Sequence, residues 1–224
     1  MKNLIQIAGV IDKAEAQMLI NAGVDYLGFP LRLPVHKEDL AEEEAVEVIK
    51  IISPPHQAVL ITYLNKAEEI ISFCNKLNVN IVQLHGKISK EEMERTKLLN
   101  PDLEIIKSLV VAESNYPELV IMIDTLSDFV DAFITDTFDP ATGAEGATGK
   151  THDWSVSRKL VEHSPKPVII AGGLNPANVK KAILEIRPAG VDVHTGVELK
   201  NGRKDLDLVK KFVEESQEGF ALIK

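Results

Sequence analysis

The feature that most constrains the fold of this chain is a regular alternation of two kinds of segment. Short apolar runs rich in β-favouring residues alternate with amphipathic helical segments along the whole sequence. Continuous apolar runs of this length are typical of parallel strands that are covered on both faces. We predict eight strands, at Leu4–Ala8, Tyr26–Phe29, Ala58–Thr62, Ile81–His85, Glu104–Val111, Ala132–Asp136, Pro167–Ala171 and Val191–His194.

Predicted helices lie between and after these strands. They cover Lys13–Asn21, Leu40–Ile52, Lys66–Leu77, Ser89–Leu99, Glu113–Phe129, Trp154–His163, Pro176–Ile186 and Asp205–Glu215. Asn175 before Pro176 predicts an N-cap followed by proline at the first helical position. Eight strands with intervening helices fit either a closed barrel or a doubly wound sheet. Only Gly9 follows the first strand, where a dinucleotide-binding sheet would carry a glycine-rich fingerprint. We therefore predict an α/β fold, a single-domain (β/α)8 TIM barrel over residues 1–224.

The net charge and the cysteine content restrict the classes of ligand and metal site that such a barrel can have. The formal net charge of −9 argues against nucleic acid or an anionic membrane as a partner, so local donors must hold a phosphorylated ligand. Cys74 is the only cysteine, which excludes an internal disulfide and a cysteine-based zinc site. No two histidines have the spacing of a helical metal site, and we predict no metal and no cofactor. Met1–Ile5 lacks the apolar core of a signal peptide, and no apolar run reaches membrane-spanning length, so we expect a cytoplasmic protein. The oligomeric state stays open.

Glycine-bearing segments follow the last three predicted strands, where a barrel carries its function. These segments are Gly146–Lys150, Ala171–Asn175 and Thr195–Glu198. Glycine lets backbone N–H groups approach an anion closely, and the loops after strands seven and eight form the usual barrel phosphate site. The alternative is that these glycines only make tight turns. We predict a phosphorylated small-molecule substrate, with its phosphate held around Gly149, Gly172, Gly173, Thr195, Gly196 and Val197.

Several segments together resemble phosphoribosylanthranilate isomerase of tryptophan biosynthesis. They run in order over nearly the whole chain and comprise Ala22–Phe29, Val82–Gly86, Gly146–Trp154, Ala171–Pro176 and Val191–Glu198. The resemblance implies an Amadori rearrangement, in which an aminoaldose phosphate becomes an aminoketose phosphate without metal or cofactor. In that family a general acid protonates the furanose ring oxygen, and a general base removes the proton from C2.

The resemblance also assigns residues to the site. The family acid is an aspartate that ends strand six, and Asp136 matches it, although an aspartate there can also simply cap a loop. Gln83, His85 and Asp192 match positions that line the substrate pocket of the family.

Two departures fall on the other half of the site. The family base is a cysteine in a Lys-x-Cys-Gly segment that ends strand one, whereas this chain has Gln6, Ala8 and Gly9 at the corresponding positions. Alanine cannot carry a proton, and a general base is typically worth about 10²–10⁴ in rate. After strand two, Lys37 stands where the family has an arginine that contacts the anthranilate carboxylate, and Arg32 is the alternative if the loop is rebuilt.

A third departure is His194, where strand eight of the family usually carries serine or asparagine. Strand alternation places it on the same face as Asp192, so both face the barrel mouth if one does. His194 is a candidate catalytic base with a suitable ordinary pKa, or else a hydrogen-bond donor to phosphate or backbone. Three hypotheses follow: a phosphoribosylanthranilate isomerase with an unusual base, an isomerase, epimerase or lyase for another phosphorylated sugar, and a non-catalytic phosphometabolite-binding protein.

Overall fold

Strands and helices alternate in the computed structural model, which describes residues 2–34, 39–112, 114–139, 144–145 and 153–223. The elements are β1 (Leu4–Ala8), α1 (Lys13–Asn21), β2 (Tyr26–Pro30), α2 (Glu42–Ile49), β3 (Gln57–Thr62), α3 (Ala67–Leu77), β4 (Ile81–Leu84), α4 (Lys90–Leu99), β5 (Glu104–Val111), α5 (Tyr116–Leu126), β6 (Ala132–Asp139), β7 (Ala144–Glu145), α6 (Trp154–His163), β8 (Val168–Ile170), α7 (Val179–Ile186), β9 (Gly190–Val193) and α8 (Leu206–Leu222). Two 3-10 turns, η1 (Ser127–Phe129) and η2 (Thr195–Val197), complete the order.

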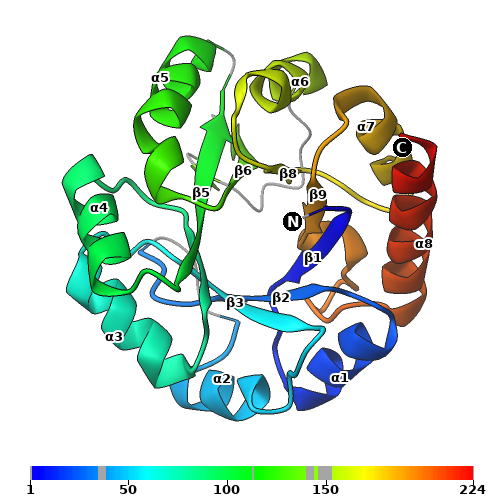
Figure 1. Cartoon of the computed structure of the whole chain (residues 1–224). Helices are drawn as coiled ribbons and strands as arrows, with labels where there is room; N and C mark the ends of the chain where they lie inside the picture. Colours follow the sequence, from blue (N-terminus) through cyan, green and yellow to red (C-terminus); the bar gives the residue numbers. More distant parts are fainter. Residues whose placement is uncertain (1, 35–38, 113, 140–143, 146–152, 224) are drawn as a thin grey trace.

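Eight parallel strands close into a barrel, which confirms the predicted fold. The hydrogen-bonded order is β1, β2, β3, β4, β5, β6, β8 and β9, and β9 pairs back with β1. Figure 1 shows this ring of strands with the helices outside it. The short β7 pairs antiparallel with the end of β6 and lies outside the barrel count, so strands seven and eight of the barrel are β8 and β9.

Two apolar cores hold the barrel together. Side chains that alternate along the strands fill its interior, including Leu4, Ala8 and Ile134. Their sequence neighbours, such as Ile5 and Ile7, face the helices and join the larger outer core. This alternation follows from the period of two in a strand, and it explains why the strands are apolar on both faces. Residues that share a face with Ala8 therefore point into the barrel.

The helix predicted from Pro176 begins later, and that prediction was wrong. α7 starts at Val179 with Asn178 as its N-cap. The Asn178 side chain donates to the Gly173 carbonyl at 3.0 Å and accepts from the Asn175 N–H at 2.8 Å. These bonds hold residues 175–178 as a turn, with Pro176 inside it, and they shape the loop that follows β8.

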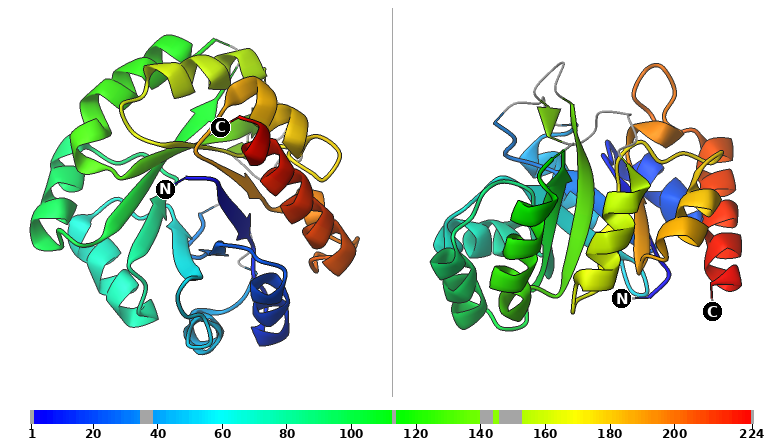
Figure 2. Two further views of the ribbon diagram at one scale, coloured as in Figure 1. Left: turned by 45° about the vertical axis from the view of Figure 1, so that its right-hand side comes forward. Right: turned by 90° about the horizontal axis from the view of Figure 1, so that it is seen from above.

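Two other elements extend several residues beyond their predicted ends. β6 continues to Asp139 because β7 pairs with its end. α8 continues past Glu215 to Leu222, because Phe220 is buried and Gly219 lets the helix approach Ile183 of α7. Figure 2 shows both chain ends at one end of the barrel and the loop after β9, in orange, at the other. None of the described helices is both long and apolar enough to cross a bilayer.

Candidate active site

A pocket of about 370 Å³ opens at the carboxyl ends of the barrel strands. Parallel strands that close into a barrel bring all their carboxyl ends to one rim, and this rim is where barrel enzymes carry their active sites. The pocket brings together nine of the residues predicted from the sequence: Gln83, His85, Asp136, Gly172, Gly173, Asp192, His194, Thr195 and Gly196. Ala8 lies in the same lining, beside residues that sequence reasoning had not singled out, including Asp39, Tyr63 and Glu198.

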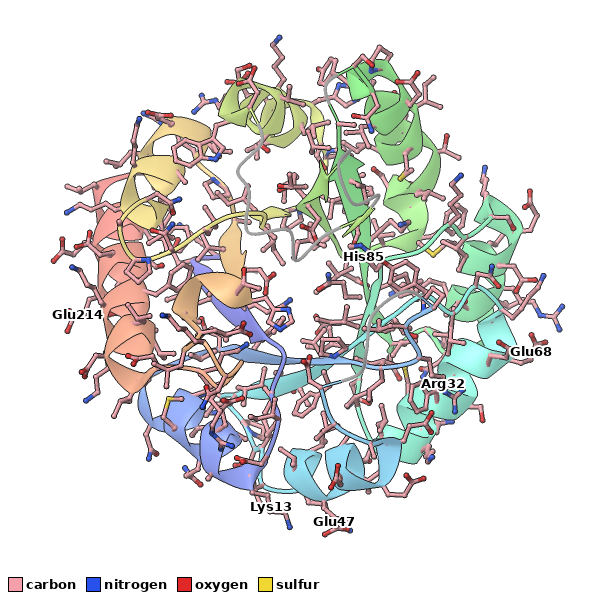
Figure 3. The ribbon with its side chains drawn as sticks, turned by 180° about the vertical axis from the view of Figure 1, so that it is seen from behind. Lys13, Arg32, Glu47, Glu68, His85 and Glu214 are labelled. Carbon is pink, nitrogen blue, oxygen red and sulfur yellow. The ribbon has the colours of Figure 1, made fainter. Side chains whose placement is uncertain are left out.

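Arg32 is not brought into this pocket. Its guanidinium donates to Glu42 at 2.8 and 3.2 Å, and it lies 3.8 Å from the centre of the Phe73 ring. These bonds, with those from Lys76, hold the pKa of Glu42 at about 2. Figure 3 shows His85 nearer the barrel axis and Arg32 among the outer helices. The guanidinium is thus committed to a surface ion pair and an aromatic face, and the structure does not support the alternative that Arg32 contacts substrate.

Three other predicted residues need separate mention. Lys37 and Gly149 lie outside the described residues. Val197 has a fully buried side chain that packs in the outer core, so a contribution to the pocket could come only from its backbone. Within the described ranges, no group of three His, Cys, Asp or Glu side chains is arranged to hold a metal ion.

A buried polar chain crosses the barrel beneath the pocket. Gln6 Nε2 donates to Gln83 Oε1 at 2.9 Å, and the Gln6 side chain also hydrogen-bonds to Asp192. Ser108 Oγ lies 3.4 Å from Gln83 Nε2 and 3.0 Å from His85 Nδ1. Gln6, which stands where the resembling family has lysine, therefore ties β1 to β4 and β9. Sequence reasoning missed Ser108 and the structural part played by Gln6, although the period of two already placed Gln6 on the inward face with Ala8.

Two carboxyl groups in the pocket have raised pKa values. Burial raises the pKa of Asp136 to about 7, although the hydrogen bond from the Thr137 N–H opposes the rise. Burial and the charge of Asp136 raise the pKa of Asp192 to about 7, against the hydrogen bond from Gln6 and the charge of Lys204. Asp192 Oδ1 is buried without a hydrogen-bond partner in the described part of the chain. Both carboxyls can therefore hold a proton near neutral pH, as a general acid must.

The loops after β8 and β9 are built closely against their neighbours. Gly172 and Gly173 have φ of +94° and +65°, a backbone region that favours glycine. A Cβ on Gly172 would overlap Thr137 Oγ1, and a Cβ on Gly196 would overlap the carbonyl oxygen of Leu174. The glycines thus make tight turns and also leave backbone exposed to the pocket. A role in tight turns is therefore compatible with the predicted role in holding phosphate.

Comparison with known proteins identifies the family. The profile of N-(5'phosphoribosyl)anthranilate (PRA) isomerase matches residues 5–215. A Methanosarcina mazei protein named N-(5'-phosphoribosyl)anthranilate isomerase 2 is 35% identical over 217 residues, which are 96% of this chain and 95% of that protein. A Methanothrix thermoacetophila protein named N-(5'-phosphoribosyl)anthranilate isomerase is 32% identical, with 93% and 95% covered.

Solved structures agree with the sequence comparison. The crystal structure of phosphoribosyl anthranilate isomerase from Thermotoga maritima matches with a TM-score of 0.81 at 28% identity, covering 96% of this chain and 98% of that one. A phosphoribosyl anthranilate isomerase crystallised with reduced 1-(o-carboxyphenylamino)-1-deoxyribulose 5-phosphate matches with a TM-score of 0.79 at 25% identity and the same coverage. The chain belongs to the phosphoribosylanthranilate isomerase family, a family of isomerases in tryptophan biosynthesis.

Proposed function

We propose that this chain converts N-(5'-phosphoribosyl)anthranilate into the corresponding aminoketose phosphate, with Asp136 as the general acid. The observation that carries the proposal is the placement of Asp136. This carboxyl group has a pKa raised to about 7 and lines a pocket that also contains the glycine loops after β8 and β9. A proton donor and an anion site on one rim are what ring opening of a phosphorylated aminosugar requires.

Substrate phosphate is proposed to bind the backbone of the two glycine loops. The donors are N–H groups of Gly172, Gly173, Thr195 and Gly196, all in the pocket lining. Thr195 and Gly196 open the 3-10 turn η2, and the first N–H groups of such a turn have no partner inside it. Because the chain is acidic overall, this local set of donors supplies the attraction that a general positive field would otherwise provide.

The proposed reaction has three proton movements. Asp136 gives its proton to the furanose ring oxygen as the ring C–O bond breaks, and the anthranilate nitrogen supplies the electron pair that forms a protonated Schiff base. Removal of the C2 proton then gives an enolamine, which tautomerises to the ketone. Gln83, His85 and Asp192 line the pocket that encloses these steps. Neither a redox partner nor a metal is needed for the electron balance.

The test is turnover of phosphoribosylanthranilate by the purified chain, with substrate and product separated by chromatography. We expect steady conversion by the wild type. Binding of the substrate without conversion would overturn the proposal in favour of a phosphometabolite-binding protein, and conversion of a different phosphorylated sugar alone would favour a diverged isomerase.

The single cysteine, Cys74, is buried and free, which fits our proposal of a reducing, cytoplasmic compartment.

Substitution of Gly172 by alanine tests the phosphate site. The new Cβ would overlap Thr137 Oγ1, so the loop must shift away from the position that holds phosphate. We expect KM for phosphoribosylanthranilate to rise about tenfold or more, since a displaced charge-assisted hydrogen bond is worth about 1.5–3 kcal/mol. Gly23→Ala is the matched control, because its φ of +86° is similar and its Cβ would meet only Val213 at 4.0 Å. An unchanged KM in Gly172→Ala, measured by steady-state kinetics, would place the phosphate elsewhere.

A further inference from the structure

The end of β1 carries no group that can accept a proton from substrate. Ala8 lines the pocket at this point, and its methyl group replaces the cysteine of the resembling family. The strand beside it is β9, in parallel register with Gln6 opposite Asp192 and Ile7 opposite Val193. Val193 is the last residue of β9, so His194 is the first residue after the strand, next to the pair formed by Ile7 and Val193.

The ring of His194 lies against the backbone that follows Ala8. A Cβ built on Gly9 would overlap this ring, with Cδ2 at 2.6 Å and Cε1 at 2.9 Å. The side chain is 23% exposed and lines the pocket. The imidazole of the residue that follows β9 therefore occupies the rim next to Gly9, one residue beyond the position of the family's base.

Charged groups around His194 fix its orientation. Its Nε2 lies 3.3 Å from Glu198 Oε1 and 3.8 Å from Asp39 Oδ2. Glu198 is itself held by Lys204, whose side chain is fully buried and whose Nζ lies 2.5 Å from the same Oε1. Histidines that act as catalytic bases are commonly held in orientation by a neighbouring carboxylate, and Glu198 stands in that position here.

We propose that His194 is the general base of this enzyme, moved from the end of β1 to the residue that follows the neighbouring strand β9, and that Glu198 is its positioning residue. This inference rests on the proposed function. The C2–H bond of the Schiff base breaks, and the proton passes to Nδ1 of the His194 imidazole, whose other nitrogen, Nε2, carries the N–H that faces Glu198. The C–H electron pair forms the C1–C2 double bond. The positively charged nitrogen takes up the electron pair of the former C–N double bond, which gives the neutral enolamine.

Substitution of His194 by asparagine separates this role from phosphate binding. We expect kcat to fall by about 10²–10⁴-fold with KM changed by less than about threefold, because the base acts only in the transition state. Adding Ala8→Cys to His194→Asn should restore part of the rate, because a thiolate then stands beside the same proton. A raised KM with kcat retained would overturn the inference and make His194 a phosphate ligand. A wild type without turnover overturns the proposed function as well, whereas an active wild type with an equally active His194→Asn overturns only this inference.

Glu198→Gln tests the positioning role. Glutamine keeps an acceptor for Lys204 but removes the negative charge beside the ring. Among the described residues, the carboxylates of Glu198, in the loop after β9, and of Asp39, in the segment before α2, lie near His194 Nε2, and Gly9, directly after β1, brings no charge. Because the ring loses the carboxylate that orients it, we expect kcat to fall at least tenfold while KM changes by less than about threefold. An unchanged kcat, or a raised KM with kcat retained, would contradict positioning by Glu198.

Gly9→Ala provides a variant that leaves every proposed acid and base in place. Its Cβ would displace the His194 ring, so we expect kcat to fall at least tenfold. Gly23→Ala again controls for strain, since φ is +80° at Gly9 and +86° at Gly23. Equal activity of the two alanine variants would contradict the proposed position of the base.

Discussion

Asp136→Asn is expected to lower kcat by about 10²–10⁴-fold while leaving substrate affinity within a few-fold of wild type. Asparagine keeps the shape of the side chain and can still accept the Thr137 N–H, which lies 2.7 Å from Asp136 Oδ1. It cannot donate a carboxylic proton to the ring oxygen, so the ring-opening step loses its acid. Steady-state kinetics with phosphoribosylanthranilate, together with a direct binding measurement, separates the two effects.

A matched control and a pH profile sharpen this test. Asp102→Asn changes an exposed aspartate and should leave kcat unchanged. The acid must be protonated to act, and its pKa is about 7, so wild-type activity should fall as pH rises through that value. This alkaline limb should disappear from the residual activity of Asp136→Asn. A variant with wild-type kcat would remove Asp136 as the acid.

Asp192→Asn is expected to make the protein more stable at pH 8 by up to about 4 kcal/mol. Asp192 is buried, with 8% of the residue exposed, and the pKa of its carboxyl group lies at about 7 instead of 3.8. Below pH 3.8 the carboxyl is neutral in both the folded and the unfolded chain. As pH rises toward 7 the unfolded chain ionises first, and the folded state loses relative stability until it ionises as well. Asparagine removes this penalty because it never ionises.

Urea unfolding at two pH values measures this effect. The variant should have a higher midpoint than wild type at pH 8, and the difference should shrink as the pH is lowered toward 4. Asp102→Asn serves here too, because an exposed carboxyl has no burial penalty to remove. A variant that is less stable than wild type at pH 8 would show that the ionised carboxylate is stabilised by its surroundings. Activity is expected to decline in Asp192→Asn, because substitutions that stabilise an active site by removing an unfavourable group commonly reduce its function.

The site has one half that matches the family, with Asp136 and the glycine loops, and one half that departs from it, at the end of β1. The glycine loops after β8 and β9 line the pocket where we propose that phosphate binds, and Asp136 lies in the same lining. Gln6 fills the position of a lysine and leaves the interior carboxyls without a cation from β1, which is consistent with the raised pKa of Asp192. The His194 ring lies against Gly9, the residue after Ala8. These changes compensate one another locally, which favours altered chemistry at the base over decay of the site.

The sequence by itself determined the architecture and the rim on which the site lies. Continuous apolar runs mark strands that are buried on both faces, amphipathic segments mark helices with one buried face, and both patterns can be recognised in a local stretch of sequence. β1, β5, α1 and α6 accordingly have the bounds that the pattern predicts. The family resemblance and strand order then placed Asp136, the glycine loops and His194 at the carboxyl ends of the strands.

Only the tertiary structure decided what these side chains contact. The register of β1 on β9 joins residues more than 180 positions apart, and it sets the His194 ring on Gly9 and Gln6 beside Asp192. Arg32 turned outward because Glu42 and Phe73 lie within reach of its guanidinium, which spacing along the chain does not reveal. The raised pKa values of Asp136 and Asp192 likewise arise from burial. Burial and strand register depend on contacts between segments that are far apart in the sequence, so neither can be predicted from a local segment.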